Sequence, residues 1–180
     1  KRPDHAVEAF QVVREQLPDA RLWIVGRGPM EERLRRSLPP GAELLGYLPR
    51  RELYERMARA HCLVVPSVRE GWGLVVGEAN SVGTPAVGYD VPGIRDSIRD
   101  GLTGFLAEAG NPAALAARCR TLLSDPGRQA ALAAQATEWA ENLSWDATAD
   151  ELMSVVRRRA SDPAVHQVPT TEPLVSGGQP

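Results

Sequence analysis

The stretch that decides the fold is HCLVVPSVREGWGLVVGEANSVGTPAVGYD, residues 61–90, in which apolar runs flank a glycine-rich loop. By propensity alone the run around Val75 would form a strand, but a strand there would leave Glu78 with no sensible face. If instead Gly73 starts a helix and Gly83 caps its end in the left-handed conformation, Glu78 lies about one turn from the helix start. The stretch therefore predicts a strand, a helix and a second strand.

The same alternation continues on both sides of this stretch. Strands separated by helices of this length need crossover connections, which implies a parallel sheet covered on both faces. We therefore predict an α/β fold with a doubly wound parallel sheet and a helical C-terminal segment. The strands are expected at 20–26, 42–48, 61–67, 84–90 and 104–109, with helices at 4–17, 28–38, 50–60, 73–82, 111–124, 126–143 and 144–160 and a turn-rich connection at 91–103.

The last third of the chain is predicted to be helical as far as Ala160. Asn111, which a proline follows, and Ser144 are the expected N-caps of two of these helices. Residues 161–180 are rich in Pro, Ser, Thr and Gly and have no periodic apolar face. We predict a disordered tail there, and a single domain over residues 1–160.

The chain opens directly on a helix, with no strand in front of it. We therefore expect the first strand of the sheet to be missing and the domain to be truncated at its N-terminus. In a doubly wound sheet this strand would lie centrally, between LWIVG at 22–26 and CLVVP at 62–66. Their facing edges would lack a ladder partner, so we expect the isolated chain to be marginally stable, prone to aggregation or dimeric.

Composition limits the classes of function. The 21 basic and 23 acidic residues are interspersed and give a net charge of -2, which is no general footprint for nucleic acid or a membrane surface. Cys62 and Cys119 lack the spacing of a metal clip or a redox pair, so we predict buried thiols in a reducing compartment and no metal site. The sequence shows neither a secretory signal nor an apolar run long enough to span a bilayer. We expect a soluble, cytoplasmic protein.

The first glycine cluster, VGRGPM at 25–30, lies at a predicted strand-to-helix turn, as in a dinucleotide-binding fingerprint. However, Glu31 occupies the third glycine position, and no acidic residue ends the next strand where it could bind a ribose. The glycines are equally explained by a tight turn and close helix packing. A dehydrogenase-type cofactor site is therefore not predicted.

The second glycine cluster surrounds Glu70 and precedes the helix predicted at 73–82. Backbone without side chains at Gly71 and Gly73 can approach a ligand, while amides near Leu74 face a phosphate. A carboxylate beside that phosphate would repel it, so Glu70 must address neutral groups, and sugar hydroxyls meet this need. Glu78 can accept two hydrogen bonds from the vicinal hydroxyls of a ribose. The alternative for Glu78 is a solvated helix residue, which its apolar neighbours disfavour.

The pair Glu70 and Glu78, with seven residues between them in EGWGLVVGE, PS before it and GTPAVG after it, resembles the signature of the retaining family 4 (group 1) glycosyltransferases of the GT-B fold. Residues Lys1 to about Arg158 match this family's donor-binding domain in order. The resemblance implies the Rossmann-like C-terminal half of a GT-B enzyme. The matching segments are KRPDHAVEAF, LWIVGRGP, LLGYLPRREL, VPGIRDSIRDGLTGFL and LSWDATADELMSVV.

The resemblance also implies roles for individual residues. Glu70 would bind hydroxyls of the transferred sugar and border the reaction centre, where we assign it to donor positioning and electrostatics. Glu78 would bind the nucleotide ribose. Lys1 matches the family's diphosphate-binding lysine, with a solvated terminus as the alternative. The remaining implied donor-binding residues are Gly46 and Tyr47 at the nucleobase, and Gly71, Trp72, Gly73, Leu74 and Val75 at the diphosphate.

The implied activity is transfer of a hexose-type sugar from a nucleoside-diphosphate sugar to a glycan, lipid or small acceptor, with retention and without a metal or other cofactor. The lack of an Asp-x-Asp motif fits metal independence, because helix amides and cations can neutralise the diphosphate. The acceptor-binding N-terminal domain and the family's arginine would lie upstream of residue 1, and the parent enzyme could associate peripherally with a membrane. Two alternatives stay open: a non-catalytic nucleotide-sugar binding module, and a sugar-nucleotide epimerase of similar architecture, which the order of motifs disfavours.

We predict that the purified 180-residue chain forms no glycoside from any nucleotide sugar, because half of the implied active site lies outside it. The measurement is product formation by mass spectrometry with UDP, GDP and ADP sugars and a panel of acceptors. Glycoside formed above the level of a boiled control would contradict this expectation.

Overall fold

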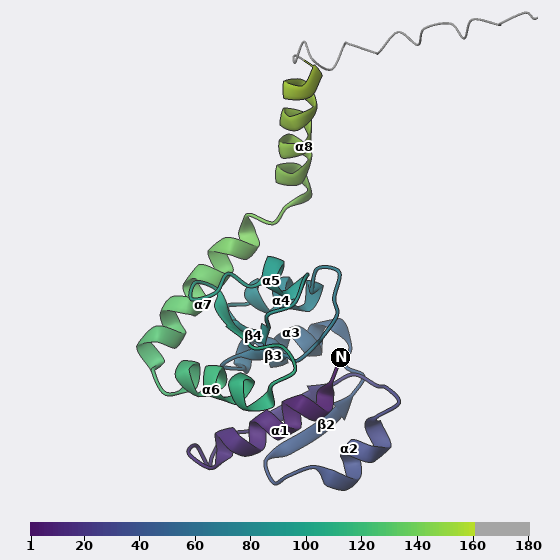
Figure 1. Cartoon of the computed structure of the whole chain (residues 1–180), viewed down its shortest axis with the longest axis vertical. Coiled ribbons are helices and arrows are strands. Elements are labelled where there is room, and N and C mark those ends of the chain that lie inside the picture. Colours follow the sequence, from purple (N-terminus) through teal and green to yellow (C-terminus); the bar gives the residue numbers. More distant parts are fainter. Residues whose placement is uncertain (161–180) are drawn as a thin grey trace, which may run out of the picture. The chain divides into compact units, whose positions relative to one another are not determined.

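The computed structural model describes residues 1–160 of the chain (Figure 1). The chain divides into two compact units, Lys1–Asn142 and Leu143–Pro180. The predicted disordered tail lies outside the described residues, and the predicted single domain over 1–160 stays a prediction. The elements are α1 (Pro3–Arg14), β1 (Leu22–Val25), α2 (Glu31–Ser37), β2 (Ala42–Gly46), α3 (Arg50–Arg59), β3 (Leu63–Val65), α4 (Leu74–Asn80), β4 (Ala86–Tyr89), α5 (Ile94–Ser97), β5 (Gly104–Ala107), α6 (Pro112–Leu123), α7 (Pro126–Glu141) and α8 (Trp145–Ala160).

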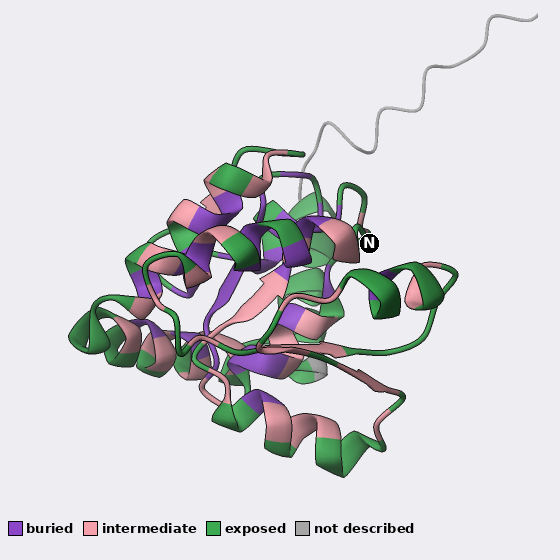
Figure 2. Ribbon diagram, turned by 90° about the horizontal axis from the view of Figure 1, so that it is seen from below, coloured by how far each residue is buried: buried purple, intermediate pink, exposed green. Residues whose placement is uncertain are grey.

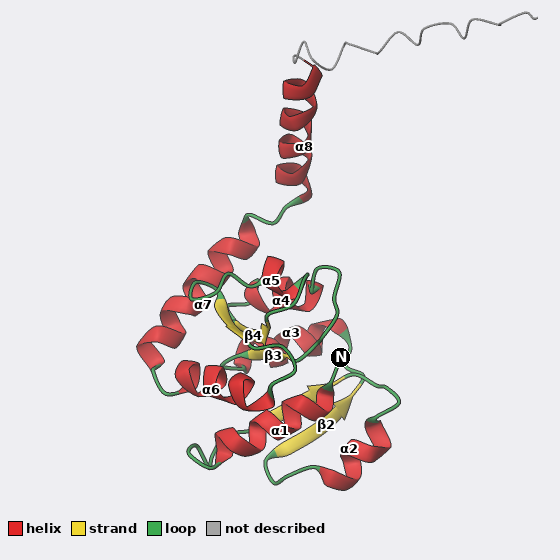
Figure 3. Cartoon of the chain, viewed as in Figure 1, coloured by secondary structure: helices red, strands yellow, loops and turns green. Residues whose placement is uncertain are grey.

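Every strand pair is parallel, as the alternation of strands and helices predicts. The strands form two hydrogen-bonded sheets, β1-β2 and β3-β4-β5, drawn as yellow arrows in Figure 3. Within the described residues no ladder joins β1 to β3. The prediction of parallel α/β architecture is confirmed, and the break in the ladder falls where the missing central strand was expected.

Strand β4 is covered on both faces and all four of its residues are buried. Successive side chains of a strand point to opposite faces, and neighbouring β4 residues accordingly meet different helices. Gly88 lies under α5, close to Ile94, whereas the hydroxyl of Tyr89 is hydrogen-bonded to His5 of α1. Helix α6 packs on α1 and on β4 and β5. Buried residues, purple in Figure 2, accordingly occur in both helices and strands.

The predicted helix starts are confirmed by their caps. The Asn111 side chain accepts a hydrogen bond from the Ala114 amide at 3.1 Å, with a proline at the first helical position. In the second unit, the Ser144 hydroxyl accepts a hydrogen bond from the Ala147 amide at 3.0 Å. Each cap satisfies an amide that has no partner within its own helix.

The segment 91–103, predicted as turns, contains the short helix α5. Ile94 and Ile98 are 0% and 1% exposed, so they bury one side of this turn of helix. The Asp96 carboxylate accepts a hydrogen bond from the Gly93 amide at 3.0 Å and closes the helix start. Four residues are too few to produce a helical period in the sequence, which explains why the pattern indicated turns.

The hydrophobic core of the first unit includes Leu115, Leu122, Val76 and Val87, none of which is exposed. Cys119 of α6 belongs to this core, and Cys62 packs against it. Both thiols are free, and the neighbouring Cys62 thiol together with burial raises the pKa of Cys119 well above its usual value. The prediction of buried thiols is confirmed for Cys119, whereas Cys62 is only partly buried. Their proximity was not predicted, because the two residues lie far apart in the sequence.

We predict that Gly88→Ala destabilises the protein by about 1–3 kcal/mol, the usual cost of overpacking. A Cβ at this position would lie 2.7 Å from Cγ2 of Ile94 and 3.2 Å from the Val65 carbonyl oxygen. The matched control is Gly77→Ala in α4, where a Cβ meets nothing within 4 Å and should stabilise the helix by about 0.5–1 kcal/mol. The midpoints of denaturant unfolding measure both effects against the wild-type protein. Equal midpoints for Gly88→Ala and the wild type would show that α5 does not need this close approach to β4.

Candidate functional site

The candidate site lies at the carboxyl ends of β3 and β4. In open parallel α/β sheets ligands bind at this edge, because the loops that follow the strands meet there. Residues 66–73 connect β3 to α4 and contain Glu70. The start of α1 reaches the same loop, and the ammonium group of Lys1 donates a hydrogen bond to the Glu70 carboxylate. The structure thus brings together two predicted site residues that lie far apart in the sequence.

Glu70 is held as a carboxylate in a mostly buried position. Its side chain is only 14% exposed, against 74% for Lys1. The Lys1 hydrogen bond is the main cause that lowers the pKa of Glu70 below 4.5, and a hydrogen bond from Ser67 adds to it, although burial acts in the opposite direction. Ser67 is buried and was not among the predicted site residues. The only signal for it was its place in the PS pair before the motif.

The loop that carries Glu70 rests directly on α5. A Cβ on Gly93 would lie 2.5 Å from the Glu70 carbonyl oxygen, so only glycine permits this contact. Gly73 adopts the left-handed conformation, with φ of 73°, and a Cβ there would lie 2.9 Å from Cδ1 of Ile94. The predicted left-handed cap at Gly83, with φ of 76°, is confirmed as well. The glycines therefore serve close packing as well as any approach of a ligand.

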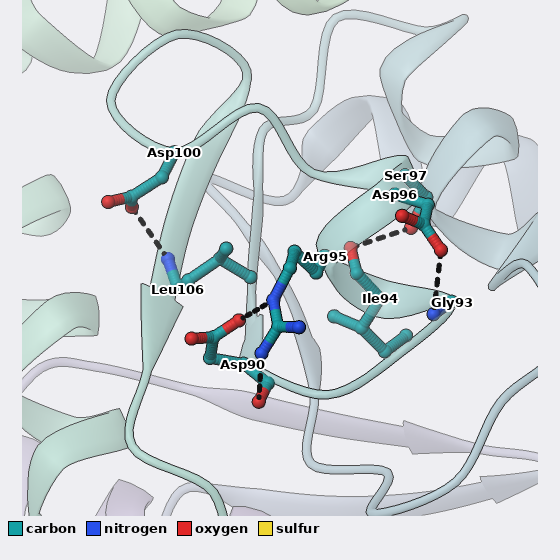
Figure 4. Close-up of polar contacts among 8 residues, drawn as sticks. All are labelled: Asp90, Gly93, Ile94, Arg95, Asp96, Ser97, Asp100 and Leu106. Carbon is teal, nitrogen blue, oxygen red and sulfur yellow. Dashed lines mark hydrogen bonds and ion pairs between the residues drawn. The ribbon is translucent and has the colours of Figure 1, made fainter.

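The α5 segment is braced by its own polar contacts (Figure 4). The Asp96 carboxylate binds the Gly93 amide, and the Arg95 guanidinium binds the Asp90 carboxylate that follows β4. The Asp100 carboxylate accepts a hydrogen bond from the Leu106 amide at 2.8 Å and ties the following turn to β5. These contacts make the segment a firm support for the glycine-rich loop.

The start of α4 agrees with the predicted helix. Leu74 is its first residue and is 75% exposed, and Trp72 just before it is 41% exposed. No side chain caps this helix, and its first backbone hydrogen bond runs from the Val76 amide to the Gly73 carbonyl at 2.8 Å. The amides of Leu74 and Val75 therefore precede the hydrogen-bonded part of the helix.

Glu78 lies on α4 and is partly exposed. Arg50 is the first residue of α3. Its hydrogen bond to the Tyr54 hydroxyl is the main cause that raises the pKa of Arg50, and the nearby charge of Glu78 adds to this effect. The guanidinium also stacks on the Tyr54 ring, 5.4 Å from its centroid. Arg50 was not predicted as a site residue, because the sequence does not show that α3 and α4 are adjacent.

Gly46 and Tyr47 belong to the other sheet. Gly46 is the last residue of β2, with φ of 65°, and its carbonyl accepts a hydrogen bond from the Gly26 amide at 2.7 Å. Tyr47 follows it and is 72% exposed. Both residues stand at the carboxyl end of their strand, and their predicted contact with a nucleobase stays a prediction.

The fold and the position of the site define the class of protein: a Rossmann-like α/β domain with a polar site at the carboxyl ends of its parallel strands. The sequence model of the family described as Glycosyl transferases group 1 matches residues 1–139. The chain belongs to this family, as the resemblance of its motifs predicted.

The chain is also similar in sequence to curated proteins that are named glycosyltransferases. The chain is 37% identical over 171 residues to the D-inositol 3-phosphate glycosyltransferase of Rhodococcus opacus (strain B4), covering 87% of this chain and 38% of that protein. It is 45% identical over 100 residues to the protein of that name in Rhodococcus jostii (strain RHA1), covering 55% of this chain and 22% of the relative. The chain thus spans well under half the length of these relatives.

Solved structures share the fold. The pneumococcal O-GlcNAc transferase GtfA, in complex with UDP and GlcNAc, matches 90% of this chain and 34% of its own with a TM-score of 0.74 and 25% identity. TarM matches 86% of this chain and 32% of its own with a TM-score of 0.77 and 23% identity. These matches confirm the predicted Rossmann-like half of the GT-B fold. Over residues 1–160, no helix has the length and apolar character required to cross a membrane.

We predict that Lys1→Met raises the pKa of Glu70, because the variant removes the ammonium group that chiefly lowers it. Since the folded-state pKa lies below 4.5, the contact contributes stability at neutral pH that is lost as pH falls through the lowered value. A carboxyl ¹³C titration of Glu70 measures the change. Arg21→Met, which removes a cation at the opposite ends of the strands, is the control and should leave this pKa unchanged.

Proposed function

We propose that this chain is the donor-binding half of a retaining glycosyltransferase that transfers a sugar from a nucleoside-diphosphate sugar to a glycan, lipid or small acceptor. The observation that carries the proposal is the ionised Glu70 carboxylate, held by Ser67 and Lys1 at the carboxyl end of β3. A mostly buried carboxylate beside an exposed cation is suited to a ligand that offers both hydroxyl groups and negative charge.

A nucleotide sugar would exchange the Lys1–Glu70 contact for two contacts of its own. An ammonium group is a mobile point charge, and Lys1 is largely exposed, so it can turn toward a diphosphate. The Glu70 oxygens released by Lys1 would then accept hydrogen bonds from sugar hydroxyls. This exchange supports the proposal, because neither ionic group is left without a partner before or after binding.

The ribose would bind at Glu78. Its carboxylate is partly exposed and can accept hydrogen bonds from two vicinal hydroxyls. The neighbouring Arg50 places a positive charge near this carboxylate. Gly46 and Tyr47, at the carboxyl end of β2, would meet the nucleobase.

The departing diphosphate would be stabilised by Lys1 and by the amides from Gly71 to Val75, which lie just before α4 and in its first turn. Such donors act without a metal ion, and metal independence and retention are both part of the proposal. The acceptor would be bound mainly outside this chain, and the enzyme would work in the cytoplasm. UDP is the first nucleotide to test, because the solved O-GlcNAc transferase that resembles this chain is in complex with UDP and GlcNAc.

We predict that Glu78→Gln weakens the binding of UDP about tenfold or more, because charged hydrogen bonds contribute about 1.5–3 kcal/mol. Glu70→Gln should leave the affinity for bare UDP unchanged or slightly higher, since it removes a negative charge beside the diphosphate. Glu70→Gln should weaken only the binding of UDP-glucose and UDP-GlcNAc. Their affinity should fall to that of bare UDP, because the variant removes the contacts with the sugar.

Calorimetric titrations of UDP and the two UDP sugars into the 180-residue chain measure these effects, with Glu138→Gln on the exposed side of α7 as a matched control. If Glu70→Gln abolishes the binding of bare UDP while Glu78→Gln leaves it intact, the two roles are assigned wrongly. If no nucleoside diphosphate binds the wild-type chain, including GDP and ADP, the proposal is wrong.

A further inference from the structure

A chain of side-chain contacts joins the end of β4 to the residues just before α1. His5 is 7% exposed and Tyr89 is completely buried. Their contact, from Nδ1 of His5 to the Tyr89 hydroxyl, is 2.8 Å long, and the two rings meet edge to face at an interplanar angle of 80°. The guanidinium of Arg2 contacts the other ring nitrogen, Nε2 of His5. Both nitrogens of this buried imidazole are therefore engaged.

The chemistry of Arg2 determines the direction of these hydrogen bonds. A guanidinium can only donate, so Nε2 of His5 must accept and carries no proton. The proton of the neutral ring then lies on Nδ1, which donates to the Tyr89 oxygen. Burial raises the pKa of Tyr89 to about 12, so its hydroxyl stays neutral and adds no charge to the chain of contacts. The order of donation is thus Arg2 to His5 to Tyr89.

The backbone of Arg2 shows that this residue is held in place. With φ of 51° and ψ of 53°, it is the single non-glycine residue with positive φ among residues 1–160. This conformation is unfavourable for a side chain with a Cβ and persists where surrounding contacts impose it. Here the guanidinium is bound on one side by His5 and on the other by the Asp4 carboxylate, at 3.2 and 3.3 Å. The left-handed turn sets the direction in which Lys1 leaves α1.

We propose that Arg2, His5 and Tyr89 are positioning residues: their hydrogen-bonded chain fixes the left-handed turn at Arg2 and so directs the side chain of Lys1 toward the Glu70 carboxylate. This inference rests on the proposed function in one respect, namely that the same ammonium group serves the diphosphate of a donor. The contact of Lys1 with Glu70 is itself an observation of the structure and does not rest on that function.

The alternative is that His5 and Tyr89 only satisfy each other inside the core, since buried polar groups need partners. In that case their loss would reduce stability and leave Lys1 where it is. The two cases differ in a local readout, the pKa of Glu70, because Lys1 is the main cause of its lowering. Lys1 is also the single lysine among the 180 residues, so no other lysine can replace it.

The test uses Tyr89→Phe, which removes the hydroxyl and keeps the buried ring. We expect the pKa of Glu70, followed by its carboxyl ¹³C shift, to rise by about half or more of the rise that Lys1→Met produces, and the Kd for UDP to increase about three- to tenfold. In the Lys1→Met background, Tyr89→Phe should add no further change to either quantity, because the group that it positions is already absent.

Arg2→Met is the second variant, and because Arg2 is exposed it does not threaten the core. It should give the same rise in the pKa of Glu70. The control is Thr84→Val, which removes another buried hydroxyl, the one that donates to the Met57 carbonyl at 2.6 Å. It should lower stability and leave Glu70 unchanged.

An unchanged pKa of Glu70 in both Tyr89→Phe and Arg2→Met would overturn the positioning role, whatever their effect on stability. If the wild-type chain binds no UDP, the proposed function fails at that step, but the Glu70 titration still decides whether Lys1 is positioned in this way.

Discussion

The candidate site depends on the absence of a side chain at two glycines. Gly88 lets α5 lie directly on β4, and Gly93 lets the loop that carries Glu70 lie directly on the start of α5. A Cβ at either position would come within 2.7 Å of a neighbouring atom, closer than packed atoms tolerate. The position of Glu70 relative to the sheet therefore follows from two close contacts made at glycine backbone.

The two opposite charges of the site, on Glu70 and Lys1, differ in how far they are exposed to solvent. Glu70 is mostly buried and Lys1 is mostly exposed, so the carboxylate is fixed while the ammonium group can move. Exposed ion pairs contribute little to stability, and a pair with one mobile member can be exchanged for other partners at little cost. This asymmetry is what a site for a ligand with both hydroxyls and phosphates requires, and it links the fold of the β3–α4 loop to the proposed donor binding.

The polar side chains near this pair are also hydrogen-bonded to one another or to nearby backbone. His5 and Tyr89 satisfy each other within the core, and Arg2 extends their contact to the surface beside Lys1. Asp96 and Asp90 perform the corresponding task for α5, because each accepts a hydrogen bond from a neighbouring residue of the same segment. Hydrogen-bonded side chains thus lie beside Lys1 and in the α5 segment on which the Glu70 loop rests.

Local features were readable from the sequence by itself: the type and order of the main helices and strands, the caps at Asn111 and Ser144, and the helical state of the segment after Gly73. Each depends on residues within a few positions of one another, through side-chain periodicity or a hydrogen bond to a nearby amide. The pattern around Glu70 and Glu78 was also enough to indicate the family. Only the tertiary structure decided that α5 is a helix, that His5 meets Tyr89, that Arg50 approaches Glu78 and that the thiols of Cys62 and Cys119 are neighbours. These contacts join residues as much as 84 positions apart, and nothing in the neighbourhood of either partner records where the folded chain will bring the other.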